Sequence, residues 1–145
     1  MKDLIQTRGD VIRKNEAGMQ AIFDSSEYAI ALLQLKRGLP DYMKLHLQDL
    51  NTIKHLLGGR EPTRNLYHTV YVEKFEPDFF RIEHPQMTIV EYLYWKMRNI
   101  SNTEVSDKYI GIDAGVSDII LKKEKEYLYT YYIDNTGFRQ LKNFV

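Results

Sequence analysis

The sequence contains no cysteine among its 145 residues. This absence excludes disulfide bonds, zinc sites with cysteine ligands, iron–sulfur clusters and thiol catalysis. Long apolar runs are missing too, and none approaches the roughly 20 residues that a membrane-spanning helix requires. The first ten residues lack the apolar segment of a secretory signal. We therefore expect a cytoplasmic protein that does not enter membranes.

An excess of charge of one sign is also absent. Lysine plus arginine and aspartate plus glutamate number 20 each, so the formal net charge is zero. Proteins that bind duplex nucleic acid normally carry a basic stripe, because contacts with phosphates supply most of their non-specific affinity. The charge balance therefore argues against duplex nucleic acid as a partner. A near-neutral surface rich in aromatic residues instead favours self-association into a homo-oligomer.

The hydrophobic pattern changes at Gly58–Gly59, from the three-to-four-residue spacing of helices to the alternation of strands. Before this pair the pattern predicts three helices. The first covers residues 10–23. The second covers Tyr28–Leu35 and follows a capping arrangement at Asp24–Glu27. The third runs from Pro40 to Leu57 and ends at the two glycines.

After the glycine pair, the sequence predicts a mainly antiparallel sheet with one apolar helix. Strands Leu66–Phe75 and Phe79–His84 form a hairpin in which Glu73 lies opposite Arg81. The remaining expected elements are a helix over Met87–Ile100, strands around Lys108–Asp113, Val116–Leu121 and Tyr127–Ile133, a charged turn at 122–126, a turn at 134–137 and a short helix in the tail 138–144. We therefore predict a single α+β domain over residues 1–145, with a layer of three helices in residues 1–59 and the sheet in residues 60–145.

One segment resembles a known catalytic element. Residues Tyr109-Ile-Gly-Ile-Asp113-Ala-Gly115 resemble the first strand of the RNase H-like and actin-like ATPase superfamilies, where such a strand ends in an aspartate of a metal or phosphate site. The resemblance implies that Asp113 serves a metal-dependent nuclease or phosphotransfer enzyme. The other interpretation is a strand that simply turns at Asp113. No other catalytic motif is present, and we predict no cofactor and no metal site.

A possible anion site lies in the predicted hairpin, where His68 and His84 share one face near the open end. Arg60, Arg64 and Arg81 lie nearby, and arginine forks match the oxygens of phosphate groups. These five residues form a candidate corner for a nucleotide or another small ligand. The alternative is an ordinary solvated linker with weak surface ion pairs.

Tyrosine is concentrated in one part of the chain, since nine of the eleven residues follow Gly59. Alternation in residues 127–133 places three tyrosines on one face of a strand and Leu128 on the other. Aromatic residues are enriched at the centres of protein interfaces. The candidate interface contains Tyr127, Tyr129, Tyr131, Tyr92 and Trp95. Stacking of nucleobases and the filling of a two-sided sheet are the other interpretations.

These features favour a non-enzymatic binding protein that occludes a macromolecular partner, in the first place a protein. A small chain without cysteine and rich in lysine, isoleucine and tyrosine is typical of accessory proteins of mobile elements. An inhibitor of a host system is therefore one form of this hypothesis. The alternatives are a nucleotide-binding protein that uses the arginine–histidine corner and a metal-dependent enzyme that uses Asp113.

Overall fold

The computed structural model describes residues 8–98 and 113–144. In this part of the chain the strands are β1 (Tyr28–Leu35), β2 (Tyr67–Lys74), β3 (Ile119–Glu124), β4 (Tyr127–Asp134) and β5 (Gly137–Leu141). The helices are α1 (Arg8–Ser25), α2 (Tyr42–Leu45), α3 (Leu50–Leu56), α4 (Pro77–Glu83) and α5 (Ile89–Arg98), with a 3-10 turn, η1 (Arg64–Leu66). No helix within these ranges is both long and apolar enough to cross a membrane.

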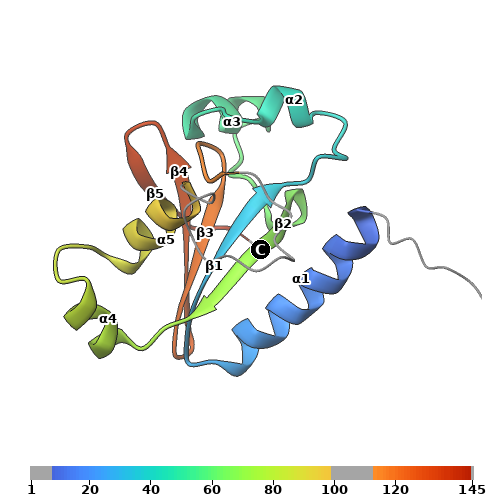
Figure 1. Ribbon diagram of the computed structural model, residues 1–145. Coiled ribbons are helices and arrows are strands. Elements are labelled where there is room, and N and C mark those ends of the chain that lie inside the picture. Colours follow the sequence, from blue (N-terminus) through green and yellow to red (C-terminus); the bar gives the residue numbers. More distant parts are fainter. Residues whose placement is uncertain (1–7, 99–112, 145) are drawn as a thin grey trace, which may run out of the picture.

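The strands form one antiparallel sheet in the order β2-β1-β3-β4-β5 (Figure 1). The last three strands are successive hairpins, joined by turns at residues 125–126 and 135–136. The predicted α+β class and antiparallel sheet are therefore confirmed. Because β1 comes from residues 1–59 and the other strands from residues 60–145, the sheet draws on both sides of the glycine pair.

Helices cover both faces of the sheet. α1 and the α2–α3 segment pack on one face, here called the α1 face, and α5 packs on the other, the α5 face (Figure 1). Alternation along β1 sends Ala31 and Leu33 to the α1 face and Ile30 and Leu32 to the α5 face. All four side chains are almost completely buried. β1 is therefore shared by two hydrophobic layers.

β1 is a strand where the sequence predicts a helix, so that prediction is wrong. Seven of its eight residues are buried. A segment that is apolar on every side suits a buried helix, but it equally suits a central strand covered on both faces. The residues expected to cap the helix instead end α1, where the Ser26 hydroxyl donates to the Ile22 carbonyl at 2.7 Å. β1 thus separates α1 from α2 and α3.

The predicted third helix is interrupted between α2 and α3. Leu47 has a φ of 66°, which a helix does not accommodate. Asp49 then caps α3, because its carboxylate accepts a hydrogen bond from the Thr52 N–H at 2.7 Å. Gly58 and Gly59 follow α3 with φ values of 73° and 87°. The predicted helix end at this glycine pair is confirmed.

Residues Phe79–His84 belong to a helix and its cap, so the predicted hairpin with β2 is wrong. Glu76 caps α4 by accepting a hydrogen bond from a backbone N–H of the first turn at 2.6 Å, and a proline occupies that turn. β2 pairs with β1 instead. The predicted contact between Glu73 and Arg81 is also wrong, since Glu73 pairs with Lys96 and Arg81 pairs within α4.

The remaining elements differ mainly in their bounds. The expected elements at 10–23, Leu66–Phe75, Met87–Ile100, Val116–Leu121 and Tyr127–Ile133 correspond to α1, β2, α5, β3 and β4. β3 extends through Glu124, which shortens the charged turn to residues 125–126. The tail forms β5 rather than a helix, because the turn before Gly137 returns the chain beside β4. The expected strand at Lys108–Asp113 lies outside the described residues, apart from Asp113 itself.

Candidate functional site

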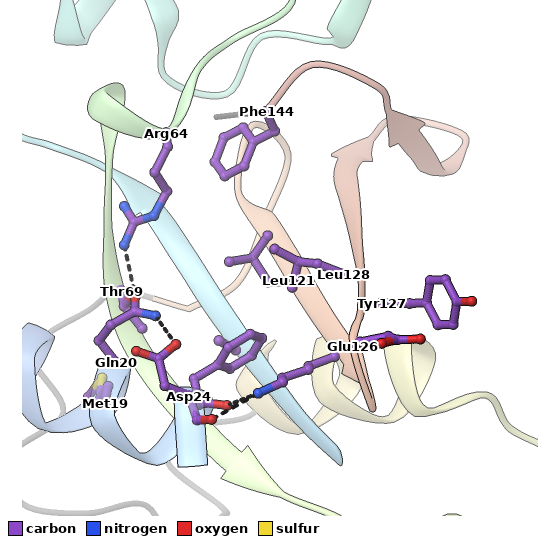
Figure 2. Close-up of a pocket in the computed structure, with 13 residues that line it drawn as sticks. Met19, Gln20, Asp24, Arg64, Thr69, Leu121, Glu126, Tyr127, Leu128 and Phe144 are labelled. Carbon is purple, nitrogen blue, oxygen red and sulfur yellow. Dashed lines mark hydrogen bonds between the residues drawn. The ribbon is translucent and has the colours of Figure 1, made fainter. Parts of the chain in front are cut away.

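An apolar groove lies on the part of the α1 face that α1 leaves uncovered (Figure 2). α1 packs over β2 and β1, and the groove lies between this helix and the β3–β4 hairpin. The volume of the groove is about 430 Å³. Its apolar lining consists of Met19, Phe23, Ala31, Leu121, Leu128 and Phe144.

The β3–β4 hairpin forms one wall of the groove. Strand alternation directs Leu121 and Leu128 to the α1 face, where both line the groove (Figure 2). Leu128 is 55% exposed, and the adjacent Tyr127 is 60% exposed. Large apolar side chains that stay open beside an apolar groove are typical of contact surfaces.

α1 forms the opposite wall through Met19 and Phe23, which lie one helical turn apart on the same side. Lys123 of β3 lines one end of the groove. Its ammonium donates to the carbonyl oxygens of Phe23 and Asp24, both at 3.0 Å. A cation at the last carbonyls of a helix satisfies unpaired acceptors and complements the helix dipole. Lys123 therefore ties the end of α1 to the hairpin.

The other end of the groove is polar. Arg64 donates to the Tyr67 carbonyl at 2.8 Å and to the Thr69 hydroxyl at 3.1 Å, and it pairs with Glu16 of α1. Phe144 lies above this end, with its ring edge-on to that of Tyr67 at 5.7 Å (Figure 2). The groove thus has an apolar floor and fixed charged groups at its two ends.

Tyr129 and Tyr131 of β4 lie on the opposite face of the sheet from Leu128, whereas Tyr132 is buried on the α1 face. The rings of Tyr129 and Tyr131 lie 4.9 and 5.8 Å from the Lys122 ammonium. Tyr131 is partly buried against the core beneath α5, whereas Trp95 on α5 is 60% exposed. The predicted interface residues therefore do not form one uniform exposed ladder.

Tyr92, another predicted interface residue, belongs to a half-buried polar cluster between α5 and β2. The Lys96 ammonium lies 2.5 Å from the Glu73 carboxylate, 3.0 Å from the Tyr71 hydroxyl and 3.4 Å from the Tyr92 hydroxyl. Burial raises the pKa of Tyr71 to about 12 and also raises the pKa of Tyr92. Both phenols stay protonated near neutral pH, and the cluster joins the helix to the sheet.

The structure does not bring the five residues of the arginine–histidine corner together. Arg64 lies in η1, directly before β2, and His68 lies at the start of β2. Arg81 lies on α4 and His84 at its end, beyond the far end of that strand. His68 is buried in the sheet, and the His84 ring lies against aromatic rings of α4 and α5. Arg60 is exposed in the loop after α3. The corner depends on a hairpin that the chain does not form.

Asp113 is exposed and directly precedes Ala114, which is buried. The Ala114 N–H donates to the Met97 carbonyl at 3.1 Å, so this segment is attached to the end of α5. Among the residues that the structure describes, no three side chains of histidine, cysteine, aspartate or glutamate are grouped as metal ligands would be. The resemblance of this segment to a catalytic strand therefore rests on the sequence alone.

A buried carboxylate at the start of β3 is a feature that the sequence analysis missed. Asp118 is only 4% exposed. Its Oδ2 accepts hydrogen bonds from the Gln34 side chain and the Gly115 N–H, both at 3.0 Å. Burial raises the pKa of Asp118 to about 7. In the sequence, the one local sign of this site is that Asp118 directly precedes Ile119 and Ile120, the apolar pair that begins β3.

The residue before this carboxylate connects three parts of the fold. Ser117 is fully buried and has a φ of 83°, an unusual conformation for a residue with a side chain. Its hydroxyl accepts a hydrogen bond from the Leu47 N–H at 3.0 Å, and its carbonyl accepts one from the Tyr67 hydroxyl at 2.9 Å. The turn before β3 is therefore fixed to β2 and to the loop between α2 and α3.

The fold defines a small α+β protein whose five-stranded antiparallel sheet is covered on both faces and carries an apolar groove on one of them. A family model described as the YodL-like domain matches residues 29–144. The chain therefore belongs to the YodL-like family. The matched region contains α2 to α5 and the whole sheet apart from the first residue of β1, whereas α1 precedes it. No curated protein and no solved structure matches the chain.

Proposed function

We propose that this protein is a non-enzymatic binding protein that covers a surface of another protein. In this proposal, the groove between α1 and the β3–β4 hairpin receives an apolar segment of the partner. The observation that carries the proposal is the exposure of Leu128 and Tyr127 beside a groove with an apolar floor. Burial of a side chain such as Leu128 contributes about 1.5–3 kcal/mol, so a few such contacts support specific binding.

The width of the sheet favours an amphipathic helix as the partner segment. Strands in a sheet lie about 4.8 Å apart, so five strands span about 19 Å between the outer two. One helix with its side chains covers about 10 Å. α1 lies over β2 and β1, and the α2–α3 segment covers the end of β4 near Tyr132. This leaves room for about one further helix beside α1, over the parts of β3 and β4 near their hairpin turn. The apolar side of that helix would lie on Leu121 and Leu128.

Polar side chains of the partner helix would contact the charged groups at the two ends of the groove. Asp24 and Glu126 line one end together with Lys123, and Arg64 lines the other. Such groups fix the direction and register of a bound helix, while the apolar contacts supply most of the affinity. An inhibitor that occludes a surface of a host protein is the form of this function that the composition favours.

Two neighbouring residues on opposite faces of β4 give a direct test. We expect Leu128→Gln to weaken partner binding at least tenfold, or by about 1.4 kcal/mol, because it removes apolar surface from the groove. Tyr129→Gln, at the next position but on the α5 face, is expected to leave the affinity nearly unchanged. Glutamine is preferred to aspartate because Leu128 lies opposite Lys123 in the sheet, and a new carboxylate would compete for that ammonium.

The measurement uses a peptide selected from a phage-displayed library of amphipathic helices on the unmodified protein. Fluorescence anisotropy of the synthetic peptide then gives the Kd for each variant, and circular dichroism checks that the sheet is intact. Loss of binding in Tyr129→Gln with full binding in Leu128→Gln would reject the groove and place the interface on the tyrosine face. Equal loss in both variants would also contradict a groove-specific site.

We also propose that copies of the chain associate. The formal net charge of zero provides little repulsion between copies, and Tyr127, Leu128 and Trp95 are exposed apolar surface. Native mass spectrometry of the freshly purified protein is expected to show an oligomer without a retained small molecule. A monomer at every concentration would contradict self-association, and a retained mass of nucleotide size would favour a ligand-binding protein.

A further inference from the structure

α1 is attached to the sheet in an unusual way for a helix of 18 residues. A helix on the surface of a core normally buries a continuous apolar stripe. From residue 13 onward, Phe23 is the only buried side chain of α1 among those described. Glu16 and Met19 share its side of the helix at helical spacing and are half-buried. The inner face of α1 therefore includes a carboxylate where an apolar residue is expected.

That carboxylate binds an irregular point of the sheet. The register between β1 and β2 shifts between Leu32, which pairs with Tyr71, and Leu33, which pairs with Thr69. Such a bulge disrupts the hydrogen-bond ladder of a strand pair. The Thr69 N–H donates to the Glu16 carboxylate, and the Thr69 hydroxyl donates to it at 3.0 Å. Glu16 therefore supplies the acceptor for a backbone N–H at the bulge of this edge strand.

A second polar attachment holds the end of the helix. Lys123 of β3 donates to the last carbonyls of α1, as described above. Between the two attachments, α1 lies over an apolar part of the sheet that continues into the groove, with Ala31 and Leu121 on its floor. The helix thus covers apolar surface of the same kind as the floor of the open groove beside it.

The family match begins at residue 29 and so leaves α1 outside the matched domain. We infer that α1 is a displaceable strap: it detaches as a unit from the bulge at Thr69 while the five-stranded sheet stays folded, and it thereby controls how much of the α1 face a partner can reach. The part of this inference that concerns the partner rests on the proposed function of the groove. Elements with few buried apolar contacts open at lower free energy than the core of the same protein.

Hydrogen exchange of the full chain, read by mass spectrometry without any partner, tests the strap. Residues 13–25 are expected to exchange at least tenfold faster than β1 and β3. Glu16→Gln replaces a charged acceptor by a neutral amide, which weakens hydrogen bonding to the Thr69 N–H and ion pairing with Arg64. The variant should accelerate exchange in α1 and at Thr69 a further five- to tenfold, and leave β1 and β3 unchanged.

Lys14→Gln is the matched control, because Lys14 is exposed on the same helix. It should leave the exchange of α1 unchanged. Binding of the fluorescent dye ANS should increase in Glu16→Gln and not in the control, since detachment uncovers apolar surface. Exchange of α1 at the rate of β1 in the unmodified protein, or acceleration of all strands together in Glu16→Gln, would overturn the inference. Neither readout uses the peptide, so failure of the strap and failure of the groove are distinguished.

Discussion

Replacing Leu32 by alanine is expected to lower the free energy of unfolding by about 2–5 kcal/mol, the range for a leucine truncated in a packed core. Leu32 pairs with Tyr71 on β2 and with Ile120 on β3, and it is completely buried beneath α5. Because both neighbouring strands are fixed by the ladder, the cavity left by the side chain cannot close fully. For a protein of this size the loss corresponds to a fall in Tm of roughly 10 °C.

Urea unfolding, fitted with one common m value, measures the change. Leu33→Ala should cost a similar amount, because Leu33 is equally buried on the α1 face. Met43→Ala is the control, since Met43 is 85% exposed and its truncation should change the free energy of unfolding by less than about 0.5 kcal/mol. A large loss at one of the two leucines and none at the other would contradict a strand packed on both faces.

Raising the pH is expected to destabilise the protein through Asp118, and Asp118→Asn is expected to remove this dependence. Burial raises the pKa of Asp118 from its ordinary value of 3.8 to about 7. Between these two values the folded protein retains a proton that the unfolded chain releases. The free energy of unfolding therefore falls with rising pH, by up to about 1.4 kcal/mol per unit, and levels off above the folded pKa.

Comparing the unmodified protein with the Asp118→Asn variant isolates the contribution of Asp118 to the pH dependence of stability. The asparagine amide resembles the protonated carboxyl in shape and charge, so the stability of the variant relative to the unmodified protein should increase as the pH rises from about 5 to about 8. His46 has the opposite effect on the pH dependence of stability, because burial and the Arg37 charge lower its pKa. This effect is the same in both proteins and cancels in the comparison. If the difference in the free energy of unfolding between the two proteins is constant across this pH range, Asp118 is not protonated in the folded protein as proposed.

The elements that the sequence predicts well carry their own local signals. α5 has one apolar side and begins with a capping box. In this box the Glu91 carboxylate accepts a hydrogen bond from the Thr88 N–H at 2.9 Å, and the Thr88 hydroxyl accepts one from the Glu91 N–H at 3.1 Å. The predictions for β1 and α4 are wrong for different reasons. The burial of β1 depends on two layers that no local spacing reveals. The Glu76–Pro77 pair at the start of α4 was interpreted as a hairpin loop, although the same pair is a good helix start.

The groove was predictable only in part. Alternation correctly places Leu128 and Tyr129 on opposite faces of β4, but it does not say which face is open. Met19, Phe23 and Phe144 reach the groove from segments remote in the sequence, so no spacing rule connects them with Leu128. The same limitation applies to Asp118, whose partner Gln34 lies in another strand.

The central position of β1 also has a consequence for synthesis on the ribosome. β1 and β2 emerge and can pair early, but Ala31 meets its partner Leu121 only after α4 and α5 have been made. During that interval β1 has an unpaired edge and two apolar faces, and sheets built from such distant pairings form slowly. The nascent chain is therefore most prone to aggregation between the completion of α5 and the arrival of β3.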